Sequence, residues 1–238
     1  MKKTIFLIAI ISVLCMSACS QSNLKAENNN MYNFIFDEPT NAYFTNEEVK
    51  LDDLKTIVTA GINSPSAMNS QPWHFTIVNS KSKLEKIGTV MKEIMGKMKP
   101  PAGMKAPNGM KPGLAPQANV NEEAKKAGKI APKKADINSV PACIIISCKR
   151  GNEYDAGLAT TNISQMAKVL GYATKIVSSP KEAIKTEEMK KEYGVPNDMD
   201  VVGVVLIGKE DKTITPDYDG YTSATVRNGF DEMVSIIE

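Results

Sequence analysis

The amino-acid sequence predicts a three-layer domain of the α/β or α+β class, in which a sheet lies between helices. Helical and strand-like apolar patterns alternate from Leu51 to Ile207. Within this stretch, Pro141 to Ser147 is a continuous apolar run, typical of a strand that is buried on both faces. About 200 residues remain once an N-terminal leader is set aside, enough for one large domain with its own core.

Residues 1–18 have the features of a signal peptide. Lys2 and Lys3 form a basic start, and an apolar run of about a dozen residues follows, shorter than the roughly 20 that a membrane-spanning helix needs. Met16-Ser17-Ala18-Cys19 resembles the lipobox of bacterial lipoproteins, which implies that an acylated Cys19 is the first mature residue. We therefore expect an exported protein, lipid-anchored to a bacterial membrane on its periplasmic or cell-surface side. An ordinary cleaved signal with an incidental Cys19 is the alternative.

Two further stretches lack the apolar side chains from which a core is built. Residues 19–30 are polar, with three consecutive asparagines, and are expected to form a flexible tether. The folded domain then comprises residues 31–238. Inside it, Lys, Pro, Gly, Met and Ala dominate residues 98–132, so we expect a long loop or lid with one short helix near 120–128.

The first half of the domain predicts two helices and a strand. Apolar residues at helical spacing predict a helix over 51–60 that ends at Gly61. A run of β-forming residues over 73–79 predicts a strand. A second amphipathic pattern over 84–94 predicts the next helix.

The second half continues the alternation. The expected elements are a strand over 141–147, a helix over 155–171 with Gly171 at its end, a strand over 173–178, a helix over 184–193 and a strand over 201–207. Residues 209–238 are expected to form an arm.

Two cysteines fall in the domain, Cys143 and Cys148, and both lie in the apolar run. An odd spacing on a strand directs them to opposite faces, about 16 Å apart, so they cannot form a disulfide. We interpret them as small buried apolar residues.

Charge and metal-ligand composition exclude two classes of protein. The net charge is only +2, with lysines scattered among acids, so no nucleic-acid partner is predicted. His74 is the only histidine, and we interpret it as structural and predict no metal site. Met91, Met95 and Met98 have helical spacing, which favours packing over a soft Cu(I) site.

The most specific segment is a loop of short polar side chains between the first helix and the first strand. Pro65 and Pro72 restrict its backbone on either side. Ser64 and Ser66 offer hydroxyls for phosphate or ribityl oxygens. The Asn69 amide can both donate and accept, as the edge of a heteroaromatic ring requires. Taken alone, these residues favour an ordinary turn, because Ser, Asn and Pro are common in turns.

The segment Pro65 to Trp73 resembles the Pro-Ser-x-x-Asn-x-Gln-Pro-Trp signature of the nitroreductase family. Further similarities follow in order at Val140 to Ile145, at Asp155 to Tyr172, and at Arg227 with Asp231 to Val234. The likeness covers most of 31–238 except the segment 98–132. It implies a nitroreductase-like α+β fold with α/β/α layers, a mixed, mainly antiparallel sheet flanked by helices, and a homodimer.

The resemblance also implies an FMN site shared between two chains. Carried over by position, the FMN-contacting residues are Thr40, Ser64, Pro65, Ser66, Asn69, Gln71, Ile176, Val177, Ser178 and Arg227, the last at the phosphate. Backbone amides of residues 176–178 would lie near the reactive flavin nitrogen, where fixed dipoles tune the ring without a protonated side chain. No catalytic acid or base is assigned.

One motif departs from the family. The positions of its N-terminal Arg-x-Ser-x-Arg/Lys motif hold Glu38, Thr40 and Ala42, so only a hydroxyl is kept. The two missing cations would each have contributed charge-assisted bonds of about 1.5 to 3 kcal/mol. FMN then binds more weakly or through other lysines, with those of residues 98–134 as candidates.

The implied activity is that of an FMN-dependent oxidoreductase. A reduced donor, NAD(P)H in the family, passes hydride to FMN, and the flavin then reduces a nitroaromatic, quinone-like or related small-molecule acceptor. The alternative is a degenerate, non-enzymatic lipoprotein of the same fold that binds flavin or another ligand. A third hypothesis is an interaction protein that uses residues 98–132.

Overall fold

The computed structural model describes residues 43–97, 136–211 and 229–237, which all belong to the unit Thr40–Glu238. Several predicted features lie outside these residues: the leader 1–18, Cys19, the tether 19–30, Thr40, the segment 98–132 with its short helix, and Arg227. In the described ranges, no helix is both long enough and apolar enough to cross a membrane.

The described strands form one antiparallel sheet in the order β1-β2-β4-β3. Their bounds are β1 Trp73–Val78, β2 Ala142–Cys148, β3 Ala173–Val177 and β4 Asp200–Gly208. The two central strands are the most apolar, and every residue of β2 is buried. The sequence predictions of a doubly buried strand and of a mainly antiparallel sheet are confirmed.

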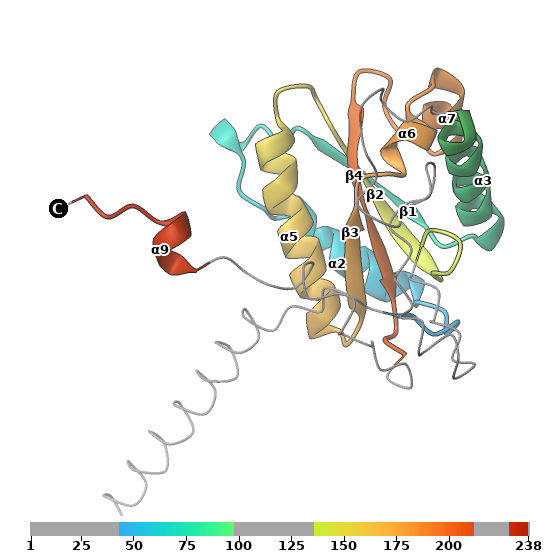
Figure 1. Ribbon diagram of the computed structural model, residues 1–238, viewed down its shortest axis with the longest axis horizontal. Coiled ribbons are helices and arrows are strands. Elements are labelled where there is room, and N and C mark those ends of the chain that lie inside the picture. The colour runs from blue at the N-terminus through green and yellow to red at the C-terminus, as the bar shows by residue number, and fades with distance from the viewer. Residues whose placement is uncertain (1–42, 98–135, 212–228, 238) are drawn as a thin grey trace, which may run out of the picture. The chain divides into compact units, whose positions relative to one another are not determined.

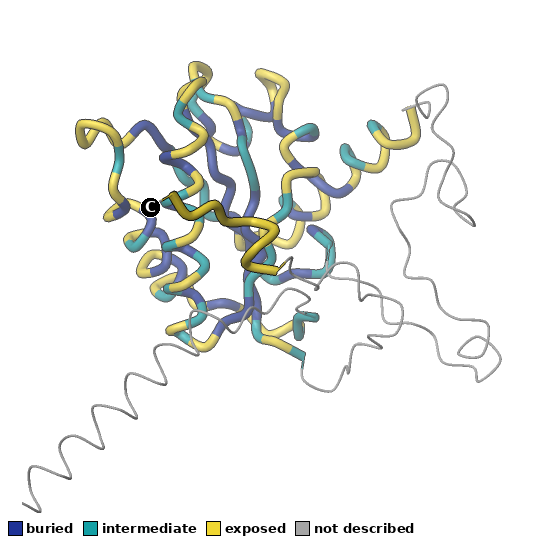
Figure 2. Tube along the Cα trace, turned by 60° about the vertical axis from the view of Figure 1, so that its left-hand side comes forward, coloured by how far each residue is buried: buried dark blue, intermediate teal, exposed yellow. Residues whose placement is uncertain are grey.

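Helices cover both faces of this sheet and complete the three predicted layers (Figure 1). On one face lie α2 (Leu51–Ile62) and α5 (Glu153–Val169), and on the other lie α3 (Lys81–Lys97), α6 (Lys181–Ile184) and α7 (Glu187–Glu192). Each face has its own apolar core, and the strands between them are the most deeply buried part of the chain (Figure 2).

The side chains of β2 alternate between the two cores. Ile145 packs with α3, α6 and α7, whereas Ile144 packs with α2 and α5. The same alternation places Cys143 in the first core and Cys148 in the second, and both thiols are free. The expectation of two buried, unbridged cysteines is therefore confirmed.

The sequence analysis predicted that the first helix ends at Gly61, and the structure differs. α2 continues to Ile62, and Asn63 closes it by donating its side-chain amide to the Thr59 carbonyl at 2.8 Å. Gly61 serves close packing instead, because a Cβ there would lie 2.7 Å from Cγ1 of Ile163 on α5. This glycine lets α2 and α5 approach each other directly under the loop that follows.

The end of α5 was predicted correctly. Gly171 has a φ of 75°, a conformation open to glycine at low cost. The amides of Gly171 and Tyr172 donate to the carbonyls of Lys168 and Ala167 at 3.0 and 2.9 Å, which is the Schellman pattern. The chain then reverses into the edge strand β3.

The single helix predicted over 184–193 is two short helices in the structure. The break falls at Thr186, whose hydroxyl accepts a hydrogen bond from the Met189 amide at 3.3 Å and so caps α7. A threonine side chain competes with the backbone for such bonds and favours a helix start over a helix interior.

The C-terminal region is described in two parts. Its first residues pair with the segment before α2, since the Thr45 amide donates to Lys209 at 2.9 Å and the Asp211 amide to Tyr43 at 2.7 Å. The second part contains α9 (Phe230–Met233), whose residues are exposed. The remainder of the expected arm, 212–228, lies outside the described residues.

Candidate functional site

The loop between α2 and β1 has an unusual backbone. Met68, Asn69 and Gln71 have φ angles of 52°, 54° and 45°, in the left-handed region that non-glycine residues rarely adopt. The first two belong to the short 3₁₀ turn η1 (Ala67–Asn69). Such conformations persist where the surrounding structure holds them, and they concentrate at functional sites.

Ser66 is the centre of the hydrogen bonds that hold this backbone. Its carbonyl accepts from the Asn69 amide and its hydroxyl oxygen from the Gln71 amide, both at 3.0 Å. The Gln71 side chain donates to the Asn69 side-chain oxygen at 3.4 Å. The serine and the two amide residues of the predicted site are therefore brought together in one compact turn.

Both ends of the loop are anchored to the body of the domain. Ser64 is only 5% exposed, and its hydroxyl oxygen accepts from the side-chain amide of Asn162 on α5 at 2.7 Å. At the other end, the Pro72 carbonyl accepts from the Lys149 amide at 3.1 Å. In this conformation Ser64 supports the loop from within and does not present a hydroxyl to solvent.

The remaining predicted loop residues face outward. Pro65, Asn69 and Gln71 are exposed, and Ser66 is half-buried. Met68 stands at the tip with 97% of its surface exposed. The loop therefore presents amide groups and one thioether on a backbone that is already ordered.

The aromatic residue after the loop packs inward. Trp73 is 8% exposed and stacks on Phe75 with ring centroids 6.2 Å apart. The carbonyl of His74 accepts from the Ser147 hydroxyl at 3.1 Å. These contacts fix the start of β1.

The second predicted set, Ile176, Val177 and Ser178, lies at the end of β3. Because β1 and β3 are the opposite edges of the described sheet, three strand spacings, about 14 Å, separate the two sets. Ile176 is 57% exposed. A single chain thus does not bring this set against the loop, and Thr40 and Arg227 lie outside the described residues.

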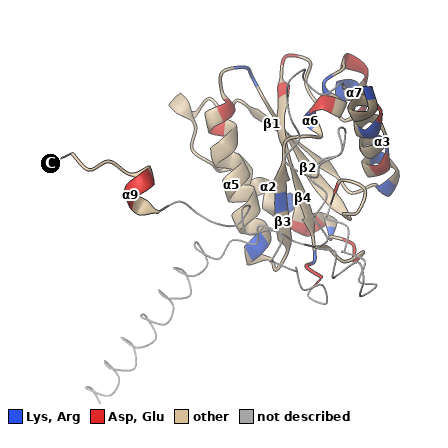
Figure 3. Cartoon of the chain, in the orientation of Figure 1, with Lys and Arg blue, Asp and Glu red and all other residues tan. Residues whose placement is uncertain are grey.

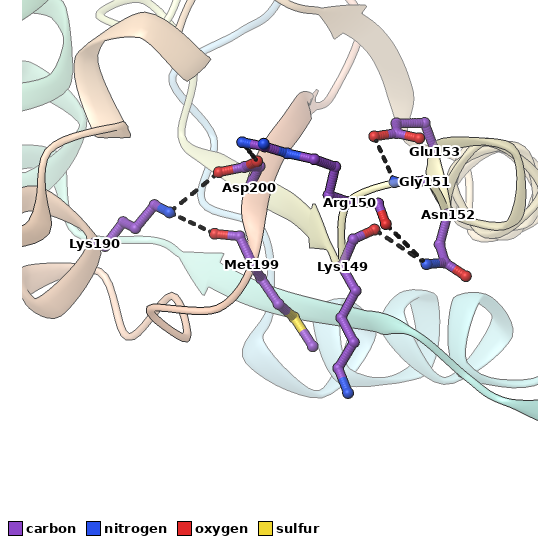
Figure 4. A network of polar contacts seen from close by, with 8 residues as sticks. All are labelled: Lys149, Arg150, Gly151, Asn152, Glu153, Lys190, Met199 and Asp200. Carbon is purple, nitrogen blue, oxygen red and sulfur yellow. Dashed lines mark hydrogen bonds and ion pairs between the residues drawn. The ribbon is translucent and has the colours of Figure 1, made fainter.

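A turn that the sequence analysis did not single out lies beside the loop. It joins β2 to α5 and is drawn in Figure 4. The Asn152 side chain donates to the carbonyls of Lys149 and Arg150 at 3.3 and 3.4 Å. Gly151 has a φ of 87°, and its amide donates to the Glu153 carboxylate at 3.1 Å. Two consecutive basic residues between a buried strand and Gly-Asn were the signal that could have revealed it.

Charges near this turn are largely paired. Lys190 donates to the Met199 carbonyl at 2.6 Å and to the Asp200 carboxylate at 3.3 Å, and Arg150 contacts the same carboxylate at 3.4 Å (Figure 4). The hydrogen bond from Lys190 and the nearby positive charges hold the pKa of Asp200 below its usual range.

Cys148 ends β2 at the same place, opposite Trp73. Burial, followed by the charges of Glu153 and Asp200, raises the pKa of its thiol to about 11. The thiolate is the nucleophilic form, so Cys148 is inert near neutral pH. Burial also raises the pKa of Cys143.

Other kinds of site are absent from the described part of the chain or lie elsewhere. No group of three or more His, Cys, Asp or Glu side chains there is placed to hold a metal ion. A surface depression of about 600 Å³ belongs to the α3, α6 and α7 layer. Its lining residues are Glu187, Glu188, Lys191, Gly194, Val195, Pro196 and Asn197, none of which was a predicted site residue.

The three layers, the antiparallel sheet and the loop before Trp73 define a nitroreductase-like fold. A sequence profile described as "Nitroreductase family" matches residues 42–209, more than half of the chain. This protein belongs to the nitroreductase family.

Solved structures share the fold at low sequence identity. A nitroreductase with bound FMN from Bacteroides fragilis NCTC 9343 has a TM-score of 0.62 and 20% identity, covering 87% of this chain and 98% of its own. A nitroreductase with bound FMN from Desulfitobacterium hafniense DCB-2 has a TM-score of 0.61, 19% identity and coverages of 87% and 97%. A BluB-like flavoprotein from Clostridium difficile 630 has a TM-score of 0.60 and 17% identity, covering 87% of this chain and 99% of its own. Among curated protein sequences, no match was found.

Proposed function

We propose that this chain is an FMN-dependent oxidoreductase that passes reducing equivalents to a nitroaromatic, quinone-like or related acceptor. The observation that carries the proposal is the loop, in which left-handed residues held by Ser66 turn the Asn69 and Gln71 amides outward. Its sequence matches the family signature, and solved relatives of the same fold have FMN in their crystals.

The groups that the loop presents fit a flavin. A flavin ring offers both acceptors and a donor along its pyrimidine edge. A primary amide such as that of Asn69 can donate hydrogen bonds to the acceptors and accept one from the donor. The Ser66 oxygen accepts from the Gln71 amide, which leaves its own proton available to donate. The loop is ordered by internal bonds, so little entropy is lost when a ligand binds.

When bound, FMN would supply the hydride chemistry, because the redox step belongs to the cofactor. The part of the loop is to bind and orient the ring. Residues 63–72 contain no titratable side chain, so the loop itself does not exchange protons. The raised pKa of Cys148 removes the nearest thiol as a competing nucleophile.

The test is a titration of purified mature protein with FMN, followed by absorbance and flavin fluorescence. We expect yellow holoprotein whose flavin bands bleach with NAD(P)H or dithionite and recover with a nitroaromatic acceptor. Asn69→Ala should weaken FMN binding about tenfold, whereas Asn197→Ala, an exposed amide in the other layer, should not. Protein that is colourless when purified and does not bind added FMN contradicts the proposal. FMN that binds and is never reduced would favour the non-enzymatic alternative.

A homodimer is the second part of the proposal. The two predicted halves of the site lie at opposite edges of the described sheet, which supports a site completed by a second copy. α5 carries no charged residue between Asp155 and Lys168, and in Figure 3 this stretch is uncoloured, whereas α3 and α7, across the sheet, carry many charged residues. Uncharged residues are exposed along it at Gly157, Thr161 and Gln165. Small, uncharged side chains on one helical face suit a symmetric close contact.

A matched pair of variants tests the dimer. Thr161 on α5 and Thr89 on α3 are both exposed, and each hydroxyl donates to the carbonyl four residues earlier. In sedimentation experiments, Thr161→Arg should give monomers while Thr89→Arg remains dimeric. A monomeric wild type, or the same mass for both variants, would overturn the proposal.

We also propose that the mature protein is a lipid-anchored, exported lipoprotein, on the strength of the lipobox-like residues before Cys19. Metabolic labelling with a fatty acid should mark the wild type in membranes. Cys19→Ala should abolish the label, and a label that persists in this variant would refute acylation at Cys19.

A further inference from the structure

Lys149 lies directly beside the loop that we propose binds FMN. It follows Cys148 at the end of β2, and its backbone amide donates to the Pro72 carbonyl at 3.1 Å. Pro72 in turn follows Gln71, one of the exposed amide residues. The Lys149 backbone is thus fixed at the exit of the loop by a hydrogen bond between segments 77 residues apart in sequence.

The ammonium of Lys149 differs from the neighbouring cations in having no partner among the described residues. Arg150 and Lys190 both contact Asp200, and Lys190 also binds the Met199 carbonyl. In Figure 4 the Lys149 side chain extends away from this network, and no dashed line reaches its nitrogen.

Two acids near this turn, Glu153 and Asp200, are already engaged. Glu153 accepts from the Gly151 amide, and Asp200 is held by Lys190 and Arg150. The pKa of each carboxyl is lowered by hydrogen bonds, that of Glu153 chiefly by backbone amides and that of Asp200 chiefly by Lys190, so both are anionic near neutral pH and paired. Neither of these two carboxylates contacts Lys149, which leaves its ammonium open to a ligand from outside this turn.

The turn also holds the Lys149 backbone in place. The Asn152 amide donates to the Lys149 carbonyl at 3.1 Å through its backbone and at 3.3 Å through its side chain. Gly151, with its φ of 87°, allows the tight reversal that these bonds close. A cation on an ordered turn loses less freedom when it binds an anion than one on a loose loop.

From these contacts we infer that Lys149 binds the phosphate group of FMN. The inference rests on the proposed function. The phosphate carries a charge near −2 and needs cationic partners, yet Glu38 and Ala42 stand at two positions where the family signature has cations. Lys149 supplies a positive charge from another element, next to the turn that holds the ring.

Comparison of FMN with riboflavin isolates the phosphate, because the two ligands differ only there. We expect Lys149→Ala to weaken FMN binding about tenfold or more, measured by flavin fluorescence, and to leave riboflavin binding unchanged. Lys149→Arg should bind FMN nearly as the wild type does. Lys92→Ala is the matched control, since Lys92 is an exposed lysine on α3 in the other helical layer.

Salt gives a second readout. The FMN affinity of the wild type should fall as ionic strength rises, and Lys149→Ala should show a shallower dependence. Equal losses for FMN and riboflavin, or no loss for either, overturn the role of Lys149 and leave FMN binding intact. A wild type that binds neither flavin overturns the proposed function, and this inference with it.

Discussion

The side-chain amide of Asn162 donates to the hydroxyl oxygen of Ser64 at 2.7 Å, joining α5 to the first residues of the loop. These residues are 98 positions apart, and Ser64 is buried beneath the turn. The Ser64 amide also donates to the Gly61 carbonyl at 3.1 Å. The loop is therefore held from α5, the helix that we propose lies between two copies of the chain.

Asn162→Ala should loosen the loop and lower the free energy of unfolding by about 1 to 2 kcal/mol, because the buried Ser64 oxygen loses its donor. FMN affinity should fall in the same variant. Urea unfolding and flavin titration measure the two effects. Asn197→Ala, at an exposed position, should change stability by less than about 0.5 kcal/mol. Equal stability of the two variants would mean that the Asn162 bond does not anchor the loop.

Gly61→Ala should destabilise the domain. The added methyl would lie 2.7 Å from Cγ1 and 2.8 Å from Cδ1 of Ile163, so α2 and α5 must separate or Ile163 must change rotamer. Overpacking of this kind costs about 1 to 3 kcal/mol, against a gain of about 1 kcal/mol in helix propensity. The control is Gly96→Ala on α3, where nothing lies within 4 Å and only the propensity gain of up to about 1 kcal/mol is expected. Thermal unfolding that shifts both variants upward would contradict the close contact.

Sequence patterns predicted the layers of this fold well because they depend on local periodicity. The apolar run before Cys148 reads as a doubly buried strand, and the odd spacing of the two cysteines separates them into different cores. The structural roles of Gly61 and Thr186 were harder to predict from the sequence. Whether a glycine ends a helix or packs inside one depends on Ile163, about 100 residues away, and a threonine in a helical pattern gives no local sign that its hydroxyl will cap a new helix.

The candidate site also has features that the sequence predicted and features that it did not. Its loop was assigned to a flavin through its resemblance to the family signature, and Ser66, Asn69 and Gln71 do lie together. Two features were not predictable. Ser64 turns inward because Asn162 reaches it from α5, and Lys149 lies beside Pro72 because of strand register. Both arise from long-range pairing, which a local pattern does not encode.

Glu192 should make stability depend on acid pH. Its carboxylate accepts from Lys83 at 2.8 Å and also from Lys86, joining α7 to α3, and these bonds lower the pKa of Glu192. A carboxyl whose pKa is lower in the folded state stabilises the fold above its unfolded pKa, about 4.3, and this stabilisation is lost as pH falls through the folded value.

The measurement is urea unfolding of wild type and Glu192→Gln at a series of pH values. The wild type should be the more stable at pH 7, and the gap should close below about pH 4 as the carboxyl is protonated. Glu188→Gln, at an exposed position of α7 with no ion pair among the described residues, should follow the wild type throughout. A gap for Glu192→Gln that is the same at both ends of the series would contradict the lowered pKa.

Substitutions at Met68 should separate backbone strain from side-chain contact. Its φ of 52° and ψ of 25° lie in the left-handed region, while its side chain is almost fully exposed. Asparagine tolerates this conformation, so Met68→Asn should match or exceed wild-type stability by up to about 1 kcal/mol and keep FMN affinity. A β-branched residue does not tolerate it, so Met68→Val should lower the free energy of unfolding by about 1 to 2 kcal/mol. It should also weaken FMN binding, because the backbone that carries Asn69 must change.

Exposed Met95 on α3 provides the control, where the stabilities of the same two substitutions should differ by less than about 0.5 kcal/mol. If Met68→Asn and Met68→Val unfold at the same urea concentration, the left-handed turn does not persist in solution and the orientation proposed for Asn69 is wrong.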